Sequence, residues 1–542
     1  MLNSDILQAD YTRLAFGYQF KLPLETDIMI DADDPVRLLS AFVEEMDLTE
    51  LYRTYERLRK NQASPRQMLK IVIYAAMNGI RSSRAIERAC RRDVNFMYLL
   101  EGKQAPDRTT IARFISLHLS CCSKEILAQM TCCLKELGEI SGKTIFIDGT
   151  KIEANANRYT FVWKKTVTKN QAKLFEKITA FVAECEASYG IRIVYNNKVS
   201  WHTLQRLYKE LGRIRKSEGI KFVHGSGKRK SPIQRSIETL KAYQKKLIEY
   251  RKHLKVCGDR NSYSKTDPDA TFMRMKDDHM RNGQLKPGYN LQHGVDAQYI
   301  TWLDISPRPT DTLTLIPFLK DMEEHLPFKY QEIVADAGYE SEEAYVFIEE
   351  NAQEAFIKPA NYEISKTRKY KKDISRRENM AYDPESDSYT CSEGRLLKAS
   401  GEKRSKTASG YERTVTIYKC ESCAGCPNKS KCIHGNNCKT PIEERNKTLH
   451  VSRIFEEKRA QCLERITTEY GTQLRMNRSI QAEGSFAYIK EDLGLRQYLY
   501  RSKENVLAES VITALAHNIG KLHFKIQGKR TGTYLSKLNE SA

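Results

Sequence analysis

The stretch TIFIDGTKIEA, residues 144–154, decides the fold that the sequence predicts. Residues 145–147 are β-branched or aromatic, and such side chains pack well on a pleated surface, so they predict a buried strand. Asp148 follows at the tip of that strand, and Gly149 predicts a turn directly behind it. In α/β sheets ligands usually bind at the carboxyl ends of strands. Asp148 is therefore a candidate ligand-binding residue, with helix capping or a bond to a neighbouring loop as the alternatives.

A second strand ends in the same way. The apolar residues 333–335 lead to Asp336, with a glycine two residues further on. Between the two aspartates, residues 288–307 read as a β-hairpin and residues 312–325 as a helix. The resulting order is strand, insertion, strand, strand, helix, strand, helix, strand. Alternation of this kind predicts an α/β fold with a mixed sheet.

Composition indicates a globular chain with a polyanionic partner. The 542 residues are enough for two to four domains, and 40% of them are hydrophobic. Lys and Arg outnumber Asp and Glu by 89 to 69, a formal net charge of +20, and such an excess favours nucleic acid. The alternative is a basic soluble protein without such a partner. No secretory signal and no apolar run long enough to span a membrane stand out, so we expect a cytoplasmic protein.

Residues 1–141 read as short helices. Helix caps are expected at Ser64, at Ser82 or Ser83, and at Asp107 or Thr109, each at the start of a helical pattern. Arginines such as Arg84 and Arg108 are expected on the surface of these helices. The pattern suits a helix-turn-helix type of DNA-binding domain. An ordinary helical domain with charged outer faces is the alternative.

A lysine-rich insertion follows, from residue 158 to residue 263. Apolar residues three or four apart in 231–256 predict a long amphipathic helix, and residues 201–216 offer an antiparallel partner. We therefore expect a basic helical hairpin. Its connecting loop carries three basic residues: Lys228, Arg229 and Lys230. These side chains are candidate DNA contacts, and a solvated basic surface is the alternative.

A third acidic candidate is Glu483. It precedes Lys490 by two helical turns, so both side chains project from nearly the same helix face. Three carboxylates about 4 Å apart would repel one another by about 4 kcal/mol per pair at a surface-like dielectric. Such a cluster needs cations, and Mg²⁺ suits carboxylate oxygens, water and phosphate.

Three blocks, residues 146–165, 333–345 and 475–509, resemble the three conserved blocks of the insertion-sequence DDE transposases. Residues 78–90 and 105–114 are similar to the N-terminal domain of the branch that also carries a Cys-rich insert before its catalytic glutamate. The resemblance implies a ribonuclease H-like core. It places the DDE triad on three residues: Asp148, Asp336 and Glu483.

The resemblance also implies DNA contacts near the third acidic residue. Lys490 matches a DNA-contacting lysine of the family. In many relatives a Tyr and an Arg precede the glutamate at fixed spacing, but Met476 and Ser479 occupy these positions here. Arg475 and Arg478 stand nearby and are the candidates for the arginine.

The activity implied is metal-dependent DNA strand cleavage and strand transfer by a two-metal mechanism with Mg²⁺ or Mn²⁺. The partners implied are double-stranded DNA, both terminal inverted repeats and target, and a second copy of the chain on DNA. The protein would be prokaryotic and nucleoid-associated when bound to DNA. A catalytically inactive, transposase-derived DNA-binding protein is the alternative. The FIDGT motif also resembles haloacid dehalogenase phosphohydrolases, but those need an aspartate where Phe146 stands.

A run of cysteines at residues 420–438 predicts a metal site, because thiolates at this spacing can converge on one tetrahedral Zn²⁺. The expected ligands are Cys420, Cys423, Cys426 and Cys432. Three residues could replace one of them: His434, Cys438 and Cys391. An iron–sulfur cluster is the rival interpretation and free thiols are the third. A zinc ion here would be structural.

These features predict the domain organisation. A helical DNA-binding domain is expected over residues 1–141 and a ribonuclease H-like catalytic domain over 142–525. The latter is interrupted by the basic hairpin at 158–263 and by a Cys-rich insertion at 363–446. Residues 526–542 are expected to form a flexible tail.

Overall fold

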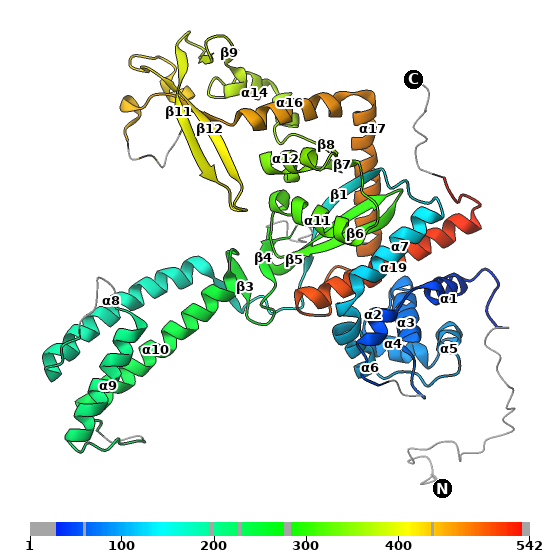
Figure 1. Ribbon diagram of the computed structural model, residues 1–542, viewed down its shortest axis with the longest axis horizontal. Helices are drawn as coiled ribbons and strands as arrows, with labels where there is room; N and C mark the ends of the chain where they lie inside the picture. Colours follow the sequence, from blue (N-terminus) through cyan, green and yellow to red (C-terminus); the bar gives the residue numbers. More distant parts are fainter. Residues whose placement is uncertain are drawn as a thin grey trace, which may run out of the picture.

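The computed structural model describes residues 29–57, 61–193, 199–225, 229–275, 283–434, 438 and 440–533 (Figure 1). A mixed sheet forms its centre, with the strand order β4-β5-β1-β7-β8 and with β6 paired to β5. Its strands are β1 (Thr144–Glu153), β4 (Thr271–Arg274), β5 (Leu285–Asp296), β6 (Tyr299–Ser306), β7 (Glu332–Ala335) and β8 (Glu354–Ile357). β1 is antiparallel to β5 and parallel to β7, which confirms the expected mixed α/β sheet.

The prediction of a turn at Gly149 is wrong. β1 continues through Gly149 to Glu153, because β5 is long enough to pair with it along this whole length, Gly149 opposite Gln292. A glycine is needed at position 149 because neighbouring side chains leave no room for a Cβ atom. A Cβ atom at position 149 would lie 2.8 Å from Oδ1 of Asp311, too close for two unbonded heavy atoms. Asp148 therefore lies within a strand, whereas Asp336 directly follows β7, as expected.

The N-terminal helices begin where the capping residues predict. Ser64 caps α3 (Pro65–Met77), Ser82 caps α4 (Ser83–Cys90) and Asp107 caps α6 (Arg108–Arg113). In each case the side-chain oxygen accepts a backbone N–H of the first turn. The other helices of this unit are α1 (Pro35–Glu45), α2 (Thr49–Arg53), α5 (Val94–Leu100) and α7 (Ser123–Glu136).

The long helix α19 (Lys503–Gln527) joins these helices to the sheet. It packs against α3, α7 and β6, and a single hydrophobic core runs through all of them (Figure 1). Two ion pairs lie along it: Arg81–Glu509 at 2.6 Å and Lys525–Glu139 at 2.6 Å. Because both pairs join residues far apart in the chain, α19 fixes the N-terminal helices on the sheet.

The insertion after β1 is a three-helix arm and not the expected hairpin. It comprises α8 (Lys164–Tyr189), α9 (Trp201–Ser217) and α10 (Pro232–Cys257), and it extends away from the sheet (Figure 1). The apolar side of α8, including Leu174, Ile178 and Val182, packs with α9 and α10 into a core of its own. A short ribbon of β2 (Phe161–Trp163) and β3 (Ser262–Ser264) closes the base of the arm.

A second sheet precedes the last helices, with the order β13-β12-β11-β10-β9. Its strands are β9 (Ala381–Asp383), β10 (Ser388–Thr390), β11 (Leu396–Lys406), β12 (Glu412–Cys420) and β13 (Thr448–Val451). The helices that follow are α16 (Arg453–Thr467), α17 (Glu469–Arg478), the π-helix η9 (Ser479–Glu483) and α18 (Gly484–Glu491). α11 (Leu315–His325) and α12 (Glu342–Glu350) complete the expected alternation around β7. No helix in the described ranges is long and apolar enough to cross a bilayer.

Candidate active site

Asp148 and Asp336 lie side by side on adjacent parallel strands. Ile147 of β1 pairs with Ala335 of β7, so the two aspartates follow directly at the same edge of the sheet. Each carboxylate also accepts a local backbone N–H: Asp148 from Gly149 at 2.8 Å and Asp336 from Gly338 at 2.8 Å. These bonds fix the orientation of both side chains relative to the strand ends.

Glu483 reaches the same place through Arg478. The Arg478 guanidinium contacts Asp148 with Nη1 to Oδ2 at 3.1 Å and Glu483 with Nη2 to Oε1 at 3.6 Å. The Asp148 and Arg478 side chains are only 15% and 16% exposed, whereas Glu483 is 63% exposed. The structure therefore brings the third predicted carboxylate to the sheet edge, with a guanidinium between it and Asp148.

The π-helix η9 explains how Arg478 and Glu483 share a contact although they are five residues apart. In a regular α-helix of about 3.6 residues per turn, side chains five positions apart point in different directions. In η9 the backbone bonds run from i to i+5, so residues at this spacing lie on one side. The π-turn thus brings the Arg478 side chain to Asp148 and Glu483, although the resemblance places the family's arginine at position 479.

Arg475, the other candidate, points elsewhere. Its guanidinium carbon lies 5.1 Å from the ring centre of Tyr362, and its Nη2 donates to Thr472 at 3.2 Å. Arg475 and Arg478 therefore have separate surroundings, and of these two arginines it is Arg478 that contacts the predicted triad.

The donor set fits a divalent cation. Among the residues that the structure describes, no three His, Cys, Asp or Glu side chains are grouped closely enough to hold a metal as they stand. The guanidinium already neutralises Asp148 and Glu483, which makes the edge a place where positive charge is stabilised. Asp148, Asp336 and Glu483 offer carboxylate oxygens, the ligands that Mg²⁺ and Mn²⁺ accept.

Comparison with protein-family models finds two parts of the chain that match. Residues 390–523 match a model described as a transposase DDE domain, and residues 24–117 match a model described as a transposase domain of the DUF772 type. These two matches support an insertion-sequence DDE transposase. Its core is accordingly ribonuclease H-like, and its helical N-terminal region is the second transposase domain. Comparison with curated proteins and with solved structures gave no match.

A polar network behind the transposase's strand β1 was missed by the sequence analysis. Asp311 accepts from Asn290 Nδ2 at 2.6 Å and from Gln292 Nε2 at 3.0 Å, and the Tyr339 hydroxyl donates to Gln292. Burial raises the pKa of Tyr339 well above its ordinary value, and the charges of Asp311, Asp148 and Asp336 act in the same direction. A fourth carboxylate therefore stands close behind the two aspartates. The only signal in the sequence was an isolated aspartate before a helix.

His293 is a second residue beside the site that the sequence did not indicate. It lies opposite Asp148 in the β1–β5 ladder and stacks on Phe486 with ring centres 4.4 Å apart. Complete burial lowers the pKa of His293 to about 3, and the charge of Lys490 contributes to this shift. Its Nδ1 is buried without a hydrogen-bond partner. The imidazole is thus neutral at physiological pH.

The other predicted DNA-binding residues lie apart from the carboxylates. Arg84 on α4 and Arg108 on α6 are exposed on the N-terminal helices. Arg229 is exposed just before α10, at the end of the arm, and Lys230 pairs with Glu238 at 2.6 Å (Figure 1). Lys228 lies outside the described residues.

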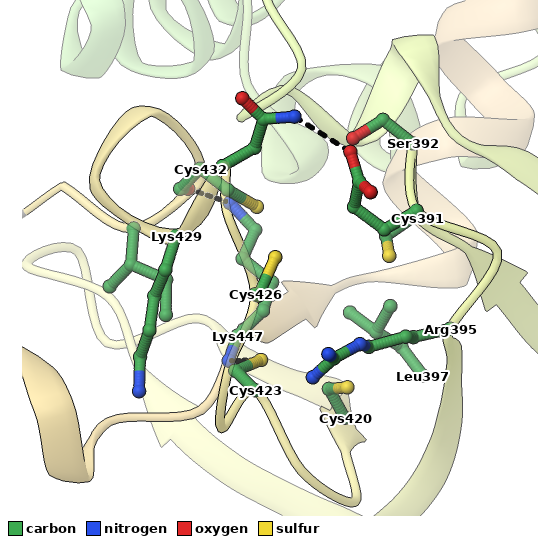
Figure 2. Close-up of a pocket in the computed structure, with 13 residues that line it drawn as sticks. Cys391, Ser392, Arg395, Leu397, Cys420, Cys423, Cys426, Lys429, Cys432 and Lys447 are labelled. Atoms are coloured by element: carbon green, nitrogen blue, oxygen red, sulfur yellow. Dashed lines mark hydrogen bonds between the residues drawn. The ribbon is translucent and has the colours of Figure 1, made fainter.

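The predicted zinc ligands gather around one small pocket in the second sheet. Five cysteines line it: Cys391, Cys420, Cys423, Cys426 and Cys432 (Figure 2). His434 and Cys438 are not among its lining residues. Within the described ranges these thiols do not yet form a metal-binding group, so the four-cysteine site expected from the spacing is not formed as the side chains stand.

Proposed function

We propose that this transposase binds the ends of its insertion sequence and catalyses DNA strand cleavage and strand transfer at Asp148, Asp336 and Glu483. The observation that carries the proposal is the Arg478 guanidinium, which joins Asp148 to Glu483 at a sheet edge where Asp336 is the next residue across. Carboxylates from distant parts of the chain that gather around one guanidinium repel one another, so the same place would also favour a bound metal cation.

Mg²⁺ or Mn²⁺ is the cofactor that these three carboxylates would hold. When bound, it would activate a water or the DNA 3′-hydroxyl as the nucleophile and would stabilise the departing oxygen of an in-line displacement at phosphorus. The protein's part is positioning. Two of the ligands sit on adjacent strands of a buried sheet, so their separation is set by the β1–β7 register and varies little. Glu483, on a helix and exposed, can adjust as DNA arrives.

Arg478 and Lys490 would act on the DNA backbone. A guanidinium that pairs with carboxylates offers the same planar donors to phosphate oxygens, so Arg478 can exchange one partner for the other. Lys490 lies on α18, the helix that follows Glu483, and its ammonium would pair with a phosphate near the reacting bond.

End recognition is assigned to the parts outside the sheet. The N-terminal unit, residues 1–141, would read the terminal repeats with exposed arginines such as Arg84 and Arg108. The arm would contact flanking phosphates through Arg229 and Lys230, and Lys228, outside the described residues, is a further candidate. Since transposition joins two ends, a homodimer on double-stranded DNA is the expected assembly.

The test is a cleavage and strand-transfer assay with DNA that carries both ends of the element encoding this chain. The proposal expects end-specific nicking and joining that require Mg²⁺ or Mn²⁺. Binding of the ends without cleavage by the wild-type protein, over a full range of metal concentrations, would instead support the inactive DNA-binding protein.

A further inference from the structure

The second sheet carries two tight turns that each present cysteines to the same pocket. In the first turn Cys391 N donates to Arg395 O at 2.9 Å, and Gly394 adopts a φ of 72°. In the second, Cys423 and Cys426 flank Gly425, whose φ is 66°. The positive φ values allow the chain to fold back within a few residues, so that a side chain at each turn points inward. Cys432 follows at the end of the short helix α15 (Lys429–Cys432).

Hydrogen bonds hold the two turns against each other. Arg395 donates to Ser422 O at 2.7 Å and to Ala424 O at 3.1 Å, which joins the first turn to the second. Asn428 Nδ2 donates to Glu393 at 2.7 Å and makes a further link (Figure 2). The scaffold around the thiols is therefore assembled by contacts that do not involve sulfur. The space between them, about 20 Å³, has room for one water-sized occupant.

We propose that Cys391, Cys423, Cys426 and Cys432 bind one structural Zn²⁺, and that Cys420 is not a ligand. This assignment corrects the spacing-based choice, which included Cys420 in place of Cys391. Binding would displace a proton from each thiol to solvent and needs rotation of the side chains toward a common centre.

Of the five cysteines, Cys420 is the one that lies within a strand. It lies in β12 opposite Leu397, it is 2% exposed, and its Sγ donates to Ser422 O at 3.4 Å. A thiol that donates a hydrogen bond in an apolar strand is a poor metal ligand, because the thiolate is the ligating form.

Cys423 and Cys432 have surroundings that suit thiolates. The Lys447 backbone N–H donates to Cys423 Sγ at 3.3 Å, and the Lys447 ammonium donates to Cys432 O at 2.9 Å. Lys447 thus lies beside two of the four proposed ligands.

A metal here would stabilise a unit with a small core. Apart from cysteines, six buried residues form it: Met380, Tyr389, Leu397, Tyr418, Leu449 and Val451. Small units with so little buried apolar surface commonly depend on a metal or disulfide.

The experiment compares Cys391→Ser with its matched control Cys420→Ser in the full-length protein. Zinc per chain is measured after purification under reducing conditions and again after reconstitution with ZnCl₂ and dialysis. We expect about one zinc per chain in the wild type and in Cys420→Ser, and loss of at least nine-tenths of it in Cys391→Ser. Retention by Cys391→Ser with loss from Cys420→Ser would overturn the ligand assignment. Iron in place of zinc, or no zinc in reconstituted wild type, would overturn the site.

Cobalt substitution in the wild-type chain tests the site even if a variant fails to fold. The wild-type chain titrated with Co²⁺ should show the intense thiolate-to-cobalt absorption of a tetrahedral four-thiolate site, and added Zn²⁺ should abolish it. Absence of that absorption would contradict the proposal whatever Cys391→Ser does. Neither readout depends on DNA cleavage, so failure of the zinc site and failure of the proposed catalytic centre are distinguishable.

Discussion

The guanidinium of Arg478 lies 3.1 Å from the carboxylate of Asp148, although 330 residues separate them in the chain. The same guanidinium contacts Glu483 at 3.6 Å. A cation of the protein itself therefore stands between two of the proposed metal ligands. It balances their charge while no DNA is bound, and it must move toward a phosphate or solvent when a metal takes its place.

Removal of this competing cation should strengthen metal binding. In Arg478→Met we expect the apparent affinity of the DNA-free protein for Mn²⁺ to rise about tenfold, or about 1.4 kcal/mol. Titration calorimetry measures it. Arg475→Met is the matched control, because the Arg475 side chain faces Tyr362 and should leave the affinity unchanged. Equal affinities in Arg478→Met and the wild type would show that Arg478 does not compete with the metal.

The three carboxylates should be indispensable for chemistry but not for end binding. Asp148→Asn, Asp336→Asn and Glu483→Gln are each expected to abolish cleavage and joining, because an amide is a weaker metal ligand of similar size. Gel shifts with end DNA should remain close to wild type. Glu491→Gln is the control, since Glu491 is exposed and pairs with Arg496. Cleavage retained in any one of the three variants removes that residue from the triad.

The close packing behind β1 predicts a large effect of one methyl group. Gly149→Ala would place a Cβ 2.8 Å from Asp311 Oδ1 and should destabilise the fold by about 1–3 kcal/mol in urea denaturation. Gly212→Ala in α9 meets nothing within 4 Å, and it should stabilise the protein by about 0.5–1 kcal/mol. If both alanines behave alike, Gly149 has no packing role.

Buried histidines predict loss of stability in mild acid. Burial lowers the pKa of His517 from its ordinary 6.5 to about 4, so the unfolded chain binds this proton first. Stability should then fall as pH drops from about 6.5 to about 4, by up to about 3 kcal/mol for this residue. His517→Asn should lessen the fall, whereas His202→Asn, at an exposed position of α9, should not. An unchanged pH profile in His517→Asn would contradict this origin.

Local signals in the sequence predicted much of the fold. Ser64, Ser82 and Asp107 cap helices as expected, because capping depends on a few neighbouring residues. The strand, hairpin and helix order around Asp336 also follows from local patterns. Gly149 was misread as a turn because the ladder with β5, more than 130 residues away, decides its conformation.

The site was only partly predictable for the same reason. The π-turn that selects Arg478 over Arg475 depends on how η9 packs against the sheet, and the sequence has no pattern for it. Asp311 and His293 gain their places through long-range pairing. Among the cysteines, spacing favoured Cys420, and the fold brings Cys391 to the same pocket from another strand connection.

Iron-directed cleavage of the polypeptide can show whether Asp148, Asp336 and Glu483 share one metal site. Fe²⁺ is substituted for Mg²⁺ with end DNA bound, and ascorbate with peroxide then generates hydroxyl radicals at the metal. If the three residues share one metal site, we expect backbone breaks near residues 148, 336 and 483 together, all suppressed by Mg²⁺ and by Asp336→Asn. Breaks at only one of these segments, or elsewhere in the chain, would contradict it.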